Sequence, residues 1–90
     1  MRDKQRSVDY ARIEAQIFKL LESRDELSSI CPSDVARSLG SADDWRQLMD
    51  PVRSVAARLV EQGRVRVTQG HDDVDIQTVK GPIRIRRPLS

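Results

Sequence analysis

The sequence predicts an α+β domain that combines three helices with a small antiparallel sheet. In residues 51–62, apolar side chains recur with the 3.6-residue period of a helix. Immediately after Gly63 the period changes to 2, because Val65 and Val67 alternate with arginines. Residues 83–86 alternate in the same way and can provide a pairing strand. Two further helical segments precede these elements.

The composition indicates one folded domain with an uneven charge distribution. The chain has 90 residues, and single domains commonly hold about 100 to 150. It carries 16 Lys and Arg against 14 Asp and Glu. Residues 80–90 contain four basic and no acidic side chains, whereas residues 70–79 contain three acidic side chains and no Lys or Arg. We expect a domain at residues 8–87, a flexible tail at residues 1–7 and a short tail at residues 88–90.

The first helix is expected from residue 8 to about residue 24. Asp9 or Ser7 can cap its start, because their side-chain oxygens can accept a hydrogen bond from a free backbone N–H. After a polar connector, residues 28–31 can form a short strand that pairs with the later strands. The apolar stripe of this helix contains Tyr10, Ile13, Ile17, Leu20 and Leu21, with Phe18 at its edge.

The second helix is expected to be short and to lead into a tight turn. Pro32 suits its first position, where no backbone N–H is needed, and Gly40 suits its end. Ser41 and Asp44 resemble a capping box that opens a turn or short helix. Trp45 follows, and we expect it to pack against the helices, since three aromatic residues are too few for a single-strand stacking platform.

The third helix is expected over residues 51–62. Asp50 can cap it, Pro51 suits its first turn, and Gly63 can end it in the left-handed conformation. Since Pro51 disfavours helical geometry at Asp50, residues 43–62 form either two helices or one kinked helix. The predicted order of elements is that of a winged helix-turn-helix domain, with residues 51–62 as its recognition helix.

The wing is expected to follow the recognition helix. A strand at residues 65–69 leads to a turn at residues 70–73 and an irregular or partly extended loop at residues 74–79. The strand at residues 83–86 then pairs antiparallel with the first. This pairing places the valines and isoleucines on the helices. The outer face carries three residues that we call the wing arginines, Arg66, Arg84 and Arg86.

A DNA-binding surface is predicted on the recognition helix. Its outward face carries Arg53, Ser54 and Arg58, and arginine can donate two hydrogen bonds to guanine in the major groove. Arg46 is expected to assist at the start of this helix. Arg53 and Arg58 are about 140° apart around the axis, so they cannot both face one base pair. Ordinary solvation is the alternative for this face.

The wing arginines indicate a polyanion nearby. Like charges that face each other across two strands are destabilising, so we expect these side chains to contact DNA phosphates. If the acidic residues of the loop stay at the wing tip, they repel phosphate, and the tip does not touch DNA. The alternative is that the loop folds back and neutralises the arginines, although surface pairs contribute only about 0 to 1 kcal/mol. The carboxylates in question are Asp72, Asp73 and Asp75.

No catalytic or metal-binding arrangement emerges from the sequence. Cys31 is the single cysteine, and we interpret it as a capping or packing residue. His71 lies beside acidic residues, but the spacing matches no zinc or calcium loop. We expect no enzymatic activity, no metal and no cofactor. The apolar stretches are too short to cross a membrane, and the first residues lack a signal peptide, so a cytoplasmic location is expected.

Four segments also carry a family resemblance, namely ICPSDVARSLG, WRQLMDPVRSVAARLV, GRVRVTQG and GPIRIRR. Together they resemble a small bacterial domain family of uncharacterised function with a winged-helix-like fold. The resemblance covers about residues 10–87. It implies the fold and a role near DNA, and it brings no established activity, ligand or catalytic residue.

Two classes of partner follow from these features. The first is duplex DNA, bound by a regulator that forms a homodimer because one short helix reads few base pairs. The alternative is a protein-interaction module that keeps the winged fold, does not bind DNA and uses its arginines on an acidic protein partner. Salt-dependent binding to duplex DNA separates these two functions.

Overall fold

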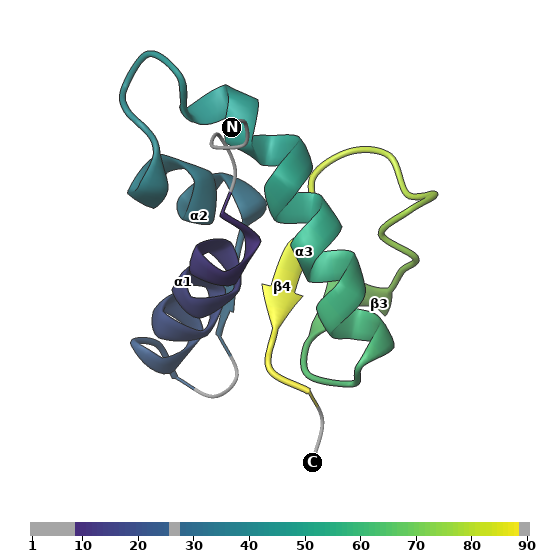
Figure 1. Cartoon of the computed structure of the whole chain (residues 1–90). Coiled ribbons are helices and arrows are strands. Elements are labelled where there is room, and N and C mark those ends of the chain that lie inside the picture. Colours follow the sequence, from purple (N-terminus) through teal and green to yellow (C-terminus); the bar gives the residue numbers. More distant parts are fainter. Residues whose placement is uncertain (1–8, 26–27, 89–90) are drawn as a thin grey trace.

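The computed structural model describes residues 9–25 and 28–88 (Figure 1). Within them, the helices are α1 (Tyr10–Glu22), α2 (Pro32–Leu39), the 3-10 helix η2 (Trp45–Leu48) and α3 (Met49–Glu61). The strands are β1 (Ser29–Ile30), β2 (Arg66–Gln69), β3 (Asp72–Asp73) and β4 (Arg84–Arg86), which form one antiparallel sheet in the order β1-β4-β2-β3. The predicted α+β class is confirmed. The tail predicted at residues 1–7 lies outside the described residues, as do residues 89–90.

Helix α1 is capped at its start and held at its end by side chains. The Asp9 carboxylate accepts a hydrogen bond of 3.0 Å from the backbone N–H of Arg12, so Asp9 is one of the two caps that the sequence offered. Arg87 donates a hydrogen bond of 2.8 Å to the carbonyl oxygen of Leu21 in the last turn. The prediction that Tyr10 belongs to the apolar stripe is wrong, because this first-turn residue is 46% exposed and burial begins at Ile13.

Helix α2 begins at Pro32 as predicted, and Cys31 precedes it as the N-cap residue. The Asp34 carboxylate accepts hydrogen bonds from the backbone N–H of Cys31 at 3.0 Å and from its thiol at 3.4 Å. No helix among the described residues is long and apolar enough to cross a membrane.

Helix α3 begins two residues earlier than predicted. It starts at Met49 without a side-chain cap, so the expectation that Asp50 caps it is wrong. The physical reason is that η2 runs directly into α3, which supplies the preceding turn. Pro51 still falls in the first turn, where its missing N–H leaves no hydrogen bond unmade. Gly63 ends the helix in the left-handed conformation (φ 72°), as predicted.

The sheet packs one face on the helices. Arg66 pairs with Arg86, Val67 with Ile85 and Thr68 with Arg84, so the two strands pair antiparallel as predicted. The buried face carries residues that are at most 3% exposed, Val65, Val67, Ile83 and Ile85. Because side chains alternate along each strand, the wing arginines share the other face, as predicted.

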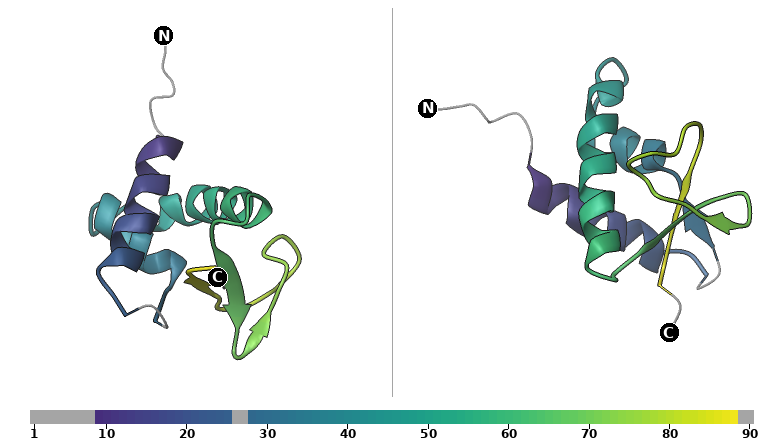
Figure 2. Two further views of the ribbon diagram at one scale, coloured as in Figure 1. Left: turned by 90° about the horizontal axis from the view of Figure 1, so that it is seen from below. Right: turned by 90° about the vertical axis from the view of Figure 1, so that its right-hand side faces the viewer.

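The connection between β2 and β4 differs in detail from the predicted wing. Asp72 pairs with Gln69 in the β2–β3 hairpin, so the turn consists of Gly70 (φ 64°) and His71 only. The chain then returns beside α3 as a loop that we call the wing loop, residues 74–83 (Figure 2). Ile76 in this loop is buried, which the sequence could not indicate because the residue lies outside any periodic segment.

Candidate nucleic-acid interface

Two of the three residues predicted for the recognition helix line a cleft beside α3. Arg53 is half-buried and Ser54 is exposed, and both line a cleft of about 480 Å³ between α3 and the wing loop. Arg58 is exposed and does not line this cleft. The cleft therefore brings Arg53 and Ser54 together, whereas Arg58, one helical turn after Ser54, lies outside it. The residues that line the cleft are Asp50, Arg53, Ser54, Ala57, Ile76 and Gln77.

The hydrogen-bond donors of the α3 arginines are unused. Within the part of the chain that the structure describes, neither Arg53 nor Arg58 donates a side-chain hydrogen bond or lies within 4.0 Å of a carboxylate oxygen. The same holds for Arg46, whose guanidinium contacts an aromatic ring instead. These three side chains can therefore offer their donors to a partner without breaking an internal polar contact.

The donors of the wing arginines are largely engaged within the chain. Arg84 donates to the hydroxyl of Ser29 at 2.8 Å and to its carbonyl oxygen at 3.0 Å, and a third contact reaches the Cys31 sulfur at 3.5 Å. Arg86 donates to the Thr68 hydroxyl at 3.0 Å. All three wing arginines are half-buried. Their charges contribute a positive potential, but most of these contacts bind the strands to one another.

Among the residues that the structure describes, the acidic loop forms an ion pair with one wing arginine. Arg66 pairs with Asp73 at 2.8 Å, and the Nε atom of Arg66 is buried without a hydrogen-bond partner. The Asp75 carboxylate instead accepts a hydrogen bond from the backbone N–H of Gln77, two residues later in the chain. The predicted alternative is that the acidic residues fold back and neutralise the wing arginines, and within the described part of the chain Asp73 is the one residue of the three that does so. Asp72 is exposed at the hairpin.

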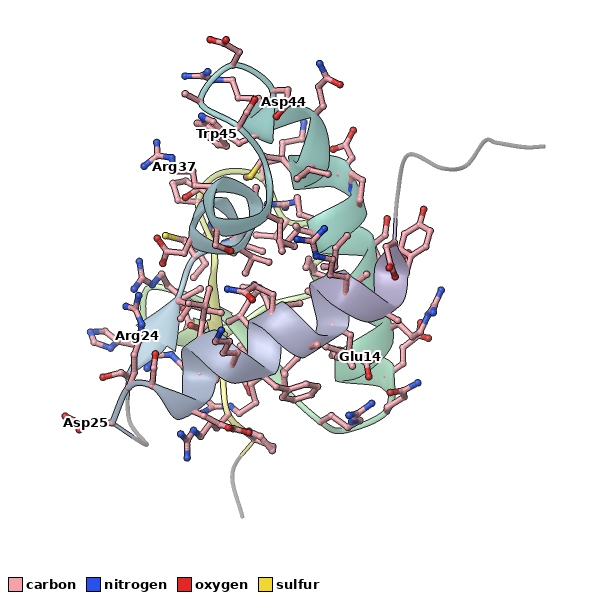
Figure 3. The ribbon with its side chains drawn as sticks, turned by 60° about the vertical axis from the view of Figure 1, so that its left-hand side comes forward. Glu14, Arg24, Asp25, Arg37, Asp44 and Trp45 are labelled. Atoms are coloured by element: carbon pink, nitrogen blue, oxygen red, sulfur yellow. The ribbon has the colours of Figure 1, made fainter. Side chains whose placement is uncertain are left out.

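An arginine of α2 that the sequence did not indicate, Arg37, joins the predicted Arg46 of η2 before the start of α3. The Cζ atom of Arg37 lies 4.4 Å from the centroid of the Trp45 ring (Figure 3). The Cζ atom of Arg46 lies 4.6 Å from the same centroid. Trp45 is half-buried and also packs against the core, as predicted. Arg37 was missed because its contact with Trp45 depends on how the chain folds back after α2, and no periodic pattern records that.

A polar cluster at the start of α2 has a structural role. Partial burial acts to raise the pKa of Asp34, but hydrogen bonds from Cys31 and the cations of Arg24 and Arg84 outweigh it and lower the pKa below its ordinary value of 3.8. The cluster thereby links α2 to β4. Among the described residues, no three His, Cys, Asp or Glu side chains gather as a metal site.

Comparison with known proteins places the chain in a family without assigning an activity. No curated protein has a sequence that matches it. A family model described as a protein of unknown function, DUF3253, matches residues 10–88, which include every helix and strand described above. The chain therefore belongs to the DUF3253 family of proteins of unknown function.

Proposed function

We propose that this protein is a winged helix-turn-helix domain that binds duplex DNA and acts in transcriptional regulation. In this proposal α3 is the recognition helix, and the β2–β3 hairpin with the wing loop forms the wing. The sheet order β1-β4-β2 and the position of α3 directly before β2 are compatible with such a fold.

The observation that carries this proposal is the set of unused arginine donors on the segment from η2 through α3. An arginine in water is already solvated, so an exposed guanidinium needs no partner for stability. On a duplex, the same group neutralises a phosphate and releases a counterion, or donates two hydrogen bonds to guanine. Three arginines whose donors have no acceptor among the described residues lie on one continuous segment, and they favour a polyanionic partner; they are Arg46, Arg53 and Arg58.

The site residues have different roles in this proposal. Arg53 and Ser54 border the cleft and face base edges in the major groove, while Arg58, one helical turn after Ser54 and outside the cleft, contacts a phosphate. The wing arginines add positive potential, and the exposed carboxylates of the β2–β3 hairpin keep its tip away from the DNA backbone.

The test measures the affinity for a random duplex of about 20 base pairs, or two helical turns, at salt concentrations from about 50 to 200 mM. The variant Arg53→Gln/Arg58→Gln should bind more weakly, and the slope of log K against log salt should become shallower by up to about 1.8, at about 0.9 per phosphate contact. The matched control is Arg12→Gln/Lys19→Gln, which removes two exposed charges from α1. If the unsubstituted protein does not bind duplex DNA at low salt, the proposal fails.

One observation favours a second function, binding to a protein partner. The exposed side of α3 also carries Asp50 and Glu61, so the four charged residues of this helix sum to zero. A charge-balanced face suits a protein surface with both signs of charge better than it suits a phosphate backbone. A protein that fails to bind duplex DNA but loses a captured partner on Asp50→Lys substitution would support this function.

A further inference from the structure

We propose that Arg37 and Arg46, held against Trp45, form a clamp for the DNA backbone beside the N-terminal end of α3. This inference rests on the proposed function and extends the interface to a residue of α2 that the sequence did not single out. The partner that fits the clamp is a pair of phosphate groups on one strand of duplex DNA.

The geometry of the clamp leaves its donors available. Both guanidinium carbons lie over the same indole ring, at 4.4 and 4.6 Å from its centroid, which is a normal cation–π distance. A guanidinium that contacts a ring through its face keeps the N–H donors at its edge. Both arginines are exposed, and neither lies within 4.0 Å of a carboxylate oxygen of the described residues.

The turn that brings the two arginines together is fixed by contacts of its own. A Cβ atom on Gly40 would lie 2.8 Å from the Cα atom of Trp45, so glycine allows the chain to pass this closely. The backbone N–H of Ser41 donates to the Asp44 carboxylate at 2.7 Å, and the backbone N–H of Asp44 donates to the Ser41 hydroxyl at 3.3 Å. These two hydrogen bonds form the predicted capping box. Figure 3 shows Arg37 of α2 beside Trp45, which follows the turn and begins η2. Because the turn is fixed, the two guanidinium groups are positioned before any partner binds.

The spacing between the clamp and Arg53 is similar to the width of the major groove. Arg46 precedes Arg53 by seven residues, which corresponds to about 12 Å along the helix axis at about 2.0 Å per residue in η2 and about 1.5 Å in α3. The major groove is about 12 Å wide. With Arg53 in the groove, the clamp therefore reaches the phosphate strand that borders it.

Substitution separates the charges of the clamp from their positioning. The variant Arg37→Gln/Arg46→Gln should bind duplex DNA more weakly, with a salt slope shallower by about 1.8. The variant Trp45→Leu keeps both charges but loses their support, so its affinity should fall about three- to tenfold with the slope nearly unchanged. Trp45→Phe should restore most of the affinity. Circular dichroism and the melting temperature of each variant verify that it is folded.

The only tryptophan of the chain gives a direct readout. The fluorescence of Trp45 should change on titration with duplex DNA and saturate at the concentration that saturates binding. The inference is overturned if the protein binds DNA while Trp45 fluorescence stays constant and Arg37→Gln/Arg46→Gln binds as tightly as the Arg12→Gln/Lys19→Gln control. It is also overturned if Trp45 responds to a polyglutamate peptide but not to DNA, which would indicate an acidic protein partner. Failure of the unsubstituted protein to bind DNA at all overturns the proposed function as well.

Discussion

The arginines of the sheet and those of the η2–α3 segment carry the same charge in very different surroundings. On the sheet, Arg84 and Arg86 donate to Ser29 and Thr68, so their side chains bind β4 to its two neighbouring strands. On the helical segment, Arg53 and Arg58 have no such contact within the described residues. The number of basic residues in a segment therefore says little about how many of them a ligand can use. Internal hydrogen bonds determine that availability.

Substitution should therefore have different effects on the arginines of the sheet and on those of the η2–α3 segment. Removal of a sheet arginine leaves polar groups of neighbouring strands without their donor, so stability should fall. Removal of a helix arginine leaves no internal acceptor unsatisfied, so any loss should appear in binding. The two sets can thus be distinguished by whether substitution changes the free energy of unfolding or the affinity for DNA.

The largest expected effect is on the stability of an Arg84→Met variant. Loss of the hydrogen bonds to Ser29 should lower the free energy of unfolding by about 2 kcal/mol, whereas Arg58→Met should change it by less than about 0.5 kcal/mol. Urea denaturation of both variants measures this difference. Equal stabilities would show that the contacts of Arg84 contribute nothing, and the distinction between the two sets would not hold.

A smaller effect is expected when the paired wing arginine is released. Asp73→Asn removes the carboxylate that pairs with Arg66, and this partly exposed pair contributes at most about 1 kcal/mol to stability. The affinity for duplex DNA should rise by a few fold, because a repelling charge is lost and the Arg66 guanidinium becomes available. A labelled duplex is titrated with this variant and with Asp72→Asn. Asp72→Asn removes the same charge without releasing Arg66, so it is the matched control. An equal gain in both variants would show that pairing does not limit Arg66.

The smallest expected effect concerns the pH dependence of stability through Asp34. Its pKa is lowered in the folded state, so it contributes stability above the unfolded-state pKa of about 3.9 that is lost as the pH falls through the folded-state pKa. In the Asp34→Asn variant, the denaturation midpoint should therefore decrease less steeply as the pH falls below about 4. Asp43→Asn is the control, because this exposed carboxylate accepts no hydrogen bond from the described residues. Identical acid profiles in both variants would rule out this role of Asp34.

Much of the fold was predictable because its signals are local. The helical period of α3 and the left-handed Gly63 follow from neighbours in sequence, and the alternation in β2 and β4 predicted the buried face of an antiparallel pair. The start of α3 was misplaced because η2 feeds into it, and two adjoining helices of different type look alike in a sequence.

The candidate site was less predictable because it depends on distant contacts. The sequence placed the wing arginines on one face but could not show that β1 and Thr68 engage their donors. It also gave no indication of Arg37, which meets Trp45 only after the chain has turned at Gly40. Availability of a charged group is a tertiary property, since it depends on which acceptors the fold brings within hydrogen-bond distance.

The most direct test compares the salt dependence of DNA binding for two double variants that remove equal charge. Arg53→Gln/Arg58→Gln should make the slope of log K against log salt shallower by about 0.9 to 1.8, whereas Arg66→Gln/Arg86→Gln should change it by less than half as much. Both are measured under conditions in which circular dichroism shows them to be folded. A larger change in slope for the sheet variant would contradict the claim that internal hydrogen bonds withhold the wing arginines from DNA.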